Sequence, residues 1–282
     1  MKLPKIILLL ALSLMLVSCG EKLSYRYADW IIGWIVDDYV DWNQPQQKQY
    51  DQAIDELLIW HKQSQLLRYR DWLIDFKVIT QQQPDATTLI NALQPLEGFS
   101  NDILVYIFED TKILLSSLSD KQVAEMLDAL QEQQEDYEDD YRHEASKKWR
   151  KRQLKTIKKI SKRFIGKLTS EQQTLVDHWV DKQEDLNSLW LDSRQRWIEQ
   201  FAHTLAIRQV VEKKQDFKGK LSVLFLEPKK LHNPHYATAI DHNIENSAEL
   251  MAALLASLNN KQRKKLDKQL DKYIDLLESL AL

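Results

Sequence analysis

The sequence has one cysteine, five glycines and six prolines among its 282 residues. Residues 96–227 contain no proline and only three glycines, Gly98, Gly166 and Gly219. Sheet proteins need frequent turns built from such residues, so the composition argues against one. Residues that favour helices, such as glutamine, leucine, lysine, glutamate and alanine, dominate instead. We therefore predict an all-α protein, either a bundle of long helices or a stack of helical hairpins.

Long apolar runs are equally scarce. The only marked one is Ile6–Leu16, interrupted by Ser13 and preceded by Lys2 and Lys5. It is too short to span a hydrocarbon core of about 30 Å, but it has the length of a signal-peptide h-region. No later run reaches the roughly 18 residues of a membrane-spanning helix. The sequence thus predicts a signal peptide over residues 1–18 and a helical domain over residues 19–282.

The single cysteine, Cys19, follows Leu16-Val17-Ser18 directly. This order resembles the lipobox of bacterial lipoproteins. The resemblance implies that the Cys19 thiol takes a diacylglycerol and that its amine, after cleavage, takes an acyl chain such as palmitate. Two or three chains together give stable membrane anchoring. An ordinary signal peptide with an incidental cysteine, or an uncleaved anchor, is the alternative.

Modification of Cys19 leaves the mature chain without a thiol for disulfides, catalysis or metal binding. We expect no cofactor besides the lipid chains. Gly20 follows the cysteine. Because an aspartate there holds lipoproteins at the inner membrane of enteric bacteria, its absence favours the outer membrane, facing the periplasm.

The mature chain is mildly acidic. Removal of residues 1–18 removes two lysines and no acids, so its net charge is (39 − 2) − 42 = −5. This charge argues against a nucleic-acid binder. The sequence also has no P-loop, no Gly-x-Gly-x-x-Gly and no Gly-x-Ser-x-Gly motif. We do not expect an enzyme.

A short motif marks several helix starts. Leu-[Ser/Thr/Asn]-x-x-Gln occurs at 118–122, 168–172 and 258–262, and 42–46 is a looser copy with Asn43 as N-cap and Pro45 in the first turn. The motif is typical of a capping box, in which the cap side chain and the glutamine each bond the other's backbone N–H. The copies are unevenly spaced, so they suggest duplicated helical hairpins at most.

Residues 120–166 predict one long helix, or two with a break near His143. Acids dominate its first part, whereas residues 147–163 contain ten basic residues and no acid. A basic helical face of this kind can contact anionic lipid head groups or an envelope protein. Its candidate residues are Lys147, Lys148, Arg150, Lys151, Arg152, Lys155, Lys158 and Lys159. The alternatives are a solvated face, or pairing with the acidic run across a hairpin.

Another long helix is expected over about 170–215. Residues 217–239 carry Gly219, Pro228 and Pro234, and predict a loop or short extended segment and a candidate sub-boundary of the domain. Two or three helices should follow.

Three sets of titratable residues are candidates for chemical sites. His232, His235 and His242 have no known metal-ligand spacing, so solvated loop residues are favoured over a zinc site. Asp37 and Asp41 share a helix face, which suits a polar helix end better than acid–base catalysis. His61, beside Trp60, is expected to be a satisfied core or boundary residue. No metal, cofactor or catalytic residue is predicted.

Residues 24–73 resemble a family of uncharacterised bacterial envelope lipoproteins that carry Tyr-x-x-Ala-Asp-Trp after the lipid cysteine. The matching residues are Tyr25 or Tyr27, Ala28-Asp29-Trp30, Asp37–Val40 and Trp60-His61. That family has no assigned activity, so the resemblance implies no catalytic residue. Trp30 and Trp34, four residues apart, are expected in the core, and an aromatic patch at the membrane interface is the alternative. We predict a lipid-anchored envelope protein that binds or scaffolds. A periplasmic helical chaperone or stress-related binder is the alternative.

Overall fold

The computed structural model describes residues 28–282, so Cys19 and the predicted signal peptide lie outside the described residues. Every regular element in this part of the chain is helical, which confirms the all-α class. The α-helices are α3 (Ala28–Asp37), α4 (Gln44–Ser64), α5 (Leu66–Gln81), α6 (Ala86–Leu93), α7 (Pro95–Ser117), α8 (Asp120–Tyr141), α9 (Ser146–Phe164), α10 (Ser170–Lys182), α11 (Asn187–Leu205), α12 (Lys214–Leu226), α13 (Pro234–Ala256) and α14 (Asn260–Ala281). The 3₁₀ turns η1 (Val211–Lys213) and η2 (Pro228–Leu231) flank α12.

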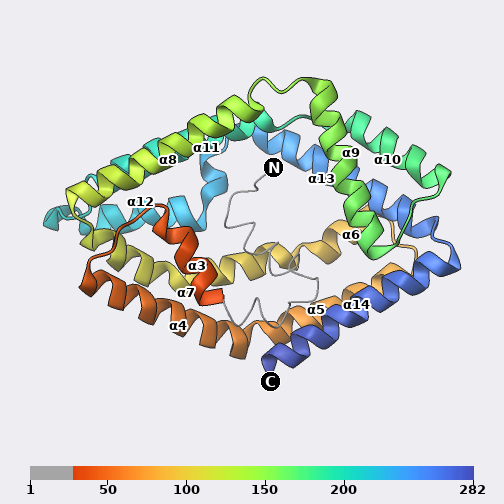
Figure 1. Ribbon diagram of the computed structural model, residues 1–282, viewed down its shortest axis with the longest axis horizontal. Coiled ribbons are helices and arrows are strands. Elements are labelled where there is room, and N and C mark those ends of the chain that lie inside the picture. The colour runs from red at the N-terminus through yellow and green to blue at the C-terminus, as the bar shows by residue number, and fades with distance from the viewer. Residues whose placement is uncertain (1–27) are drawn as a thin grey trace.

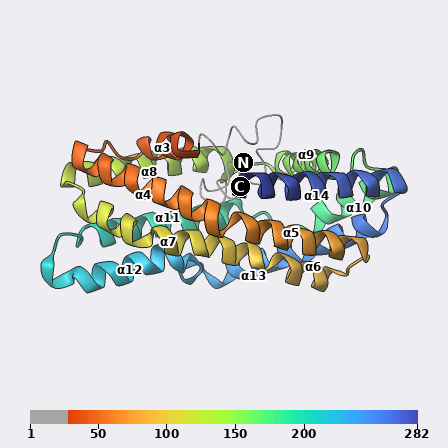
Figure 2. The same ribbon diagram turned by 90° about the horizontal axis from the view of Figure 1, so that it is seen from below.

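The helices form a flat, closed ring (Figure 1). Two helix pairs that are distant in sequence close it, because α14 packs along α5 and α11 packs along α8. Seen from the side, α3 and α9 lie along one face of the ring, and α12 and α13 lie along the opposite face (Figure 2).

All four predicted capping boxes are present, with Asn43, Ser119, Thr169 and Asn259 as the caps. Their four glutamines are buried and pair between helices. Gln46 and Gln122 exchange Nε2–H···Oε1 bonds of 3.3 and 2.8 Å. Gln172 and Gln262 do the same at 3.0 and 2.8 Å. The sequence predicted each box, and the structure adds that the boxes work in pairs.

The glutamine pairs reveal two equivalent halves of the chain, α3–α8 and α9–α14. The Nε2 of Gln46 also donates to the backbone O and Oγ of Ser117, and that of Gln172 donates to the same atoms of Ser257. Helix contacts repeat in the same order: α4 with α7 matches α10 with α13, α6 with α13 matches α12 with α7, and α5 with α14 matches α11 with α8. A pseudo-two-fold axis through the middle of the ring relates the halves (Figure 1). The repeated unit is therefore larger than the helical hairpin suggested by the motif.

Each end of the ring has its own core, built from both halves. At one end α7 and α8 pack with α11 and α12, and the core includes Phe108, Leu118, Phe201, Leu205 and Leu221. At the other end α5 and α6 pack with α13 and α14, and the core includes Leu73, Leu89, Leu254, Leu266 and Leu270. Since burial of apolar surface drives folding, neither half can complete its cores without the other.

Residues 120–166 form two helices, in agreement with the predicted break near His143, since α8 ends at Tyr141 and α9 begins at Ser146. The single helix expected over 170–215 is wrong. The chain forms α10 and α11, separated by residues 183–186. These residues include no glycine or proline that would predict a helix break.

The loop expected over residues 217–239 is also wrong, because α12, η2 and the start of α13 occupy it. Gly219 is tolerated inside α12, where Phe217, Leu221 and Leu224 supply a buried face at helical spacing. Pro228 begins η2 and Pro234 begins α13, positions where a missing N–H costs nothing. The candidate sub-boundary in this segment stays a prediction.

Candidate anion-binding face

Helix α9 is held in the ring by its apolar side. Trp149 is buried, and Leu154, Ile157 and Phe164 pack against the core formed with α13 and α14. The Phe164 ring stacks on Tyr273 of α14 with centroids 5.9 Å apart. No side chain caps the helix at Ala145. Lys162 and Arg163 lie in the last turn, where positive charge suits the helix dipole.

The opposite side of α9 is a lysine face. We use this name for Lys147, Lys148, Lys151, Lys155, Lys158, Lys159 and Lys162, all of which are exposed. At 3.6 residues per turn, these seven positions fall within an arc of about 120° and span about 22 Å of helix. Within the described chain, none of their ammonium groups has a carboxylate partner within 4 Å.

The two arginines of the predicted set have a different role. Arg150 lies against α10, with its Nε 2.9 Å from Asp181 Oδ1 and its Nη2 3.6 Å from Asp177 Oδ1. Arg152 pairs with Glu144, whose side chain is almost fully buried. Burial raises the pKa of Glu144, but the hydrogen bond and charge of Arg152, the hydrogen bond from Asn187 and the charge of Lys148 together outweigh it and leave that pKa below its ordinary value. Arg150 and Arg152 therefore fix α9 in place and present little free charge.

Lys162 was missing from the predicted set, although its position could have revealed it. It lies four residues after Lys158 and thus on the same face. The predicted set grouped residues by sequence proximity, whereas the free charges are selected by helical phase.

The lysine face carries repulsion that an anion would relieve. Lysines follow one another at a spacing of four residues in Lys147–Lys151, Lys151–Lys155, Lys155–Lys159 and Lys158–Lys162. Each such like-charge pair destabilises a helix by about 0.2–0.5 kcal/mol. A lysine ammonium is a compact, strongly hydrated charge that suits diffuse attraction to a polyanionic surface better than bidentate recognition of one group.

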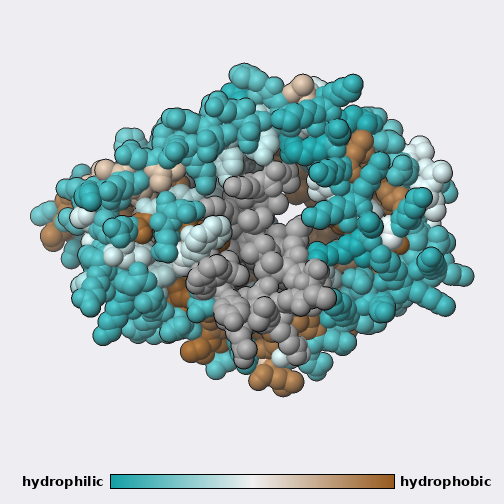
Figure 3. Space-filling model, in the orientation of Figure 1, coloured by the Kyte–Doolittle hydropathy of each residue, from teal (hydrophilic) through white to brown (hydrophobic). Residues whose placement is uncertain are grey.

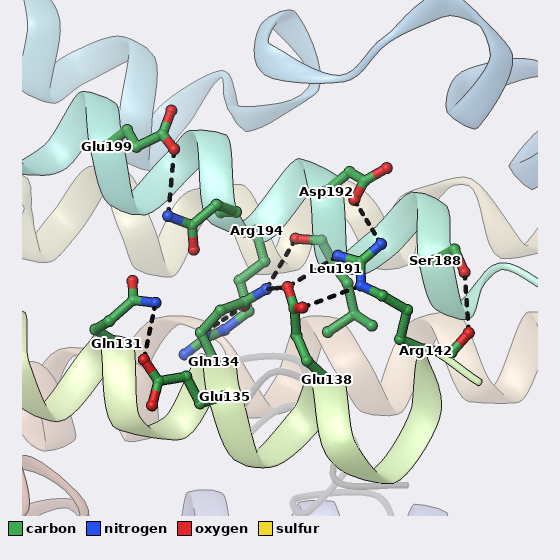
Figure 4. Close-up of polar contacts among 11 residues, drawn as sticks. Gln131, Gln134, Glu135, Glu138, Arg142, Ser188, Leu191, Asp192, Arg194 and Glu199 are labelled. Atoms are coloured by element: carbon green, nitrogen blue, oxygen red, sulfur yellow. Dashed lines mark hydrogen bonds and ion pairs between the residues drawn. The ribbon is translucent and has the colours of Figure 1, made fainter. Parts of the chain in front are cut away.

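Pairing of the acidic run with the basic run is limited to Glu144 and Arg152. Glu138 of α8 instead binds Arg142, which also reaches Asp192 of α11 at 2.9 Å (Figure 4). In the same contact between α8 and α11, the buried Gln134 donates to the backbone O of Leu191 at 3.2 Å. The lysine face therefore stays available on the described surface.

The histidine set is not brought together as a metal site. The ring nitrogen Nε2 of His242 lies 3.0 Å from the backbone O of Lys182, whereas His232 contacts the Tyr236 ring. Burial, together with Lys229 and Arg196, lowers the pKa of His232. No group of three potential metal ligands occurs within residues 28–282.

The remaining candidates are dispersed. Asp37 ends α3 and Asp38 is exposed beyond it, while the backbone O of Asp41 accepts from Gln122 Nε2 at 2.7 Å. His61 is partly buried beside Tyr69, and this burial lowers its pKa to about 4. Trp34 of α3 is 62% exposed, so the expected core position is wrong for this residue.

Two surface hollows of the described chain are candidate ligand sites. One of about 630 Å³ lies at the Gln46–Gln122 junction and is lined by Asp41, Trp42, Ser117 and Ser119 among others. Its serines are engaged, since Ser119 caps α8 and the Oγ of Ser117 donates to Leu114 O at 2.7 Å. The other, of about 390 Å³ between α11 and α12, contains the ion pair of Asp216 with Lys220. Neither hollow presents a nucleophile beside a base.

Comparison with known proteins gives one match. The model of a family of unknown function, DUF6279, matches residues 38–237. No curated protein and no solved structure matches the chain. Within the described residues, no helix is both long and apolar enough to cross a membrane.

Proposed function

This chain belongs to the DUF6279 family, and from that premise we propose that it is a lipid-anchored protein of the bacterial cell envelope that acts by binding or scaffolding and not by catalysis. The anchor would be the diacylglycerol and N-acyl chain on Cys19. The proposed location is the outer membrane, facing the periplasm. The sequence around Leu16–Cys19 supports both the cleavage and the acylation.

The observation that supports a binding role is the lysine face. Seven exposed lysines on one side of α9, without carboxylate partners in the described chain, keep a concentrated positive charge on a protein that is acidic as a whole. A surface of this kind favours an anionic partner, either lipid head groups or an acidic envelope protein.

The anchor is tested by metabolic labelling with a fatty acid and by membrane fractionation of Cys19→Ala. The substitution should abolish both the label and the membrane association, because no other thiol exists in the chain. A Cys19→Ala chain with Ser24→Cys serves as the matched control. It restores a thiol five residues away and should remain unlabelled, which shows that the position is recognised. Retained label in Cys19→Ala would refute the anchor.

A helical chaperone or stress-related binder is the second candidate. Exposed apolar side chains on α4, α5 and α7, namely Ile59, Ile74, Val78, Val105 and Ile113, favour it. Contact with unfolded chains should then fall when two of them on α5 become charged, as in Ile74→Lys with Val78→Lys. Suppression of the aggregation of a denatured client protein measures this. Unchanged suppression, or none in the wild type, would exclude this role.

A further inference from the structure

The pseudo-two-fold axis makes α3 and α9 equivalent helices, each the first of its half. An axis perpendicular to the ring places equivalent helices on the same face. Figure 2 shows both along one side of the ring, and Figure 3 looks onto that face, which is largely hydrophilic over α9. The two equivalent positions therefore project in one direction but carry opposite chemistry.

Helix α3 is the apolar member of the pair. Its sequence, ADWIIGWIVD, contains no cation. Trp34 exposes 62% of its surface, and a side chain at Gly33 would meet no neighbour within 4 Å. An exposed tryptophan on an apolar helix suits the interface between membrane and water, where the ring enters the apolar layer and its N–H remains in a polar one.

The chain length from the anchor limits where α3 can lie. Ala28 is nine residues after Cys19 in the sequence, a span of at most about 32 Å in a fully extended chain. If Cys19 is acylated, α3 lies within that distance of the bilayer. Because α3 carries Asp29 and Asp37, is followed by Asp38 and has no cation, electrostatic attraction to a membrane must come from α9.

We propose that the ring lies flat on the bilayer that holds its anchor, with Trp34 of α3 at the interface and the lysine face of α9 on the head groups of anionic phospholipids. This inference rests on the proposed lipid anchor and adds the orientation and the lipid class. Lysines near an anionic membrane surface are attracted within about a Debye length, so the contact is salt-dependent. The opposite face, with α12 and α13, then points away from the membrane.

The orientation can be measured with a single fluorophore. Acylation consumes the native thiol, so Lys155→Cys in the full-length lipidated protein provides the only free thiol for labelling. Glu245→Cys, an exposed position on α13, is the matched control on the opposite face. Both proteins are reconstituted into phosphatidylcholine vesicles with and without phosphatidylglycerol, and quenching by head-group-labelled lipid is recorded.

The label at position 155 should be quenched in phosphatidylglycerol vesicles and the label at 245 should not. Quenching at 155 should be mostly lost in about 1 M NaCl, where the Debye length is about 3 Å. It should also be lost when Lys151, Lys158 and Lys162 are changed to Gln in the labelled protein, with the helical circular dichroism retained.

Equal quenching at positions 155 and 245, or none at 155, overturns the orientation. Equal quenching at 155 with and without phosphatidylglycerol overturns the lipid class. Flotation of the same vesicles reports the anchor separately, because a protein that does not float has failed the proposed function itself.

Discussion

Gln46 and Gln122 hold each other through two reciprocal amide hydrogen bonds across helices α4 and α8, with Nε2–Oε1 distances of 3.3 and 2.8 Å. Each glutamine also completes the capping box of its own helix through its Oε1. One side chain thus caps the N-terminus of its own helix and also holds the partner helix. Gln172 and Gln262 repeat the arrangement in the other half, so the ring is joined at two equivalent points.

Loss of both members of a glutamine pair should cost less than the sum of the two single losses. Gln172 is fully buried, and Gln172→Leu leaves the amide of Gln262 without its partner. A buried unsatisfied group costs about 1–3 kcal/mol, whereas replacing both partners by apolar groups costs less than the sum. Urea denaturation of both single variants and of the double Leu variant measures the coupling. Gln52→Leu, at an exposed position of α4, should change stability little. Additive losses would show that the glutamines act independently.

The network between α8 and α11 predicts that a second substitution restores most of the stability lost through a first one. Arg194 has only neutral partners among those described: its Nη1 donates to Gln134 Oε1 at 2.7 Å, its Nη2 donates to Gln133 Oε1 at 3.0 Å, and its guanidinium lies over the Tyr137 ring. Burial lowers the pKa of Arg194, so the charged form is costly there.

Gln134→Leu should therefore destabilise the protein by about 2–3 kcal/mol, because it removes a hydrogen bond to a partly buried charge. Arg194→Met with Gln134→Leu should recover most of that loss, since the charge leaves together with its acceptor. Thermal unfolding of the two variants compares them. A double variant less stable than Gln134→Leu would mean that the Arg194 stem and its ring contact dominate.

Local structure was predictable from the sequence where the signal is local. Capping boxes at Asn43, Ser119, Thr169 and Asn259 need only neighbouring residues, and all four form. The break after Leu118 follows from the same signal. By contrast, Gly219 and Pro228 suggested a loop. The segment is helical because Phe217 and Leu221 are buried against other helices. Tertiary packing determines the secondary structure of that segment, and composition alone does not reveal this packing.

Contacts between residues that are distant in the sequence could not be predicted from local signals. That Gln46 meets Gln122, 76 residues later, depends on the path of the intervening helices. The equivalence of α3 and α9 was hidden because their sequences share neither charge nor hydropathy. For the lysine face, the positive charge was predicted, but the inward turn of Arg150 toward Asp181 required the position of α10.

Stability should fall in mild acid because of His61. Its pKa is about 4 in the folded protein against an ordinary 6.5, so the unfolded chain binds a proton below pH 6.5 that the folded protein excludes. Above pH 6.5, His61 does not change the free energy of unfolding. As the pH falls from 6.5 toward 4, it lowers that free energy progressively, by up to about 3 kcal/mol. His61→Phe should flatten the dependence between about pH 7 and about pH 5, as measured by urea unfolding. His203→Phe, at an exposed position of α11, should keep the wild-type slope. An unchanged slope in His61→Phe would contradict the assignment.

A charge reversal in the lysine face should separate stability from binding. Lys155 has lysines four residues away on both sides, Lys151 and Lys159. Lys155→Glu turns two repulsive pairs into attractive ones, each worth about 0.2–0.5 kcal/mol, so the helix and the thermal midpoint should gain slightly. The same change places a negative charge in the middle of the face and should weaken contact with polyanions.

The salt concentration that elutes the detergent-solubilised protein from a heparin column measures that contact. Lys214→Glu, an equal charge change at an exposed position of α12, is the matched control and should elute close to the wild type. A protein selected only for stability would not keep Lys155 amid four-residue repulsions, so a more stable but weaker-binding Lys155→Glu indicates that the lysines are retained for an anionic surface. If Lys155→Glu and Lys214→Glu elute together, the positive charge of α9 is an ordinary solvated face.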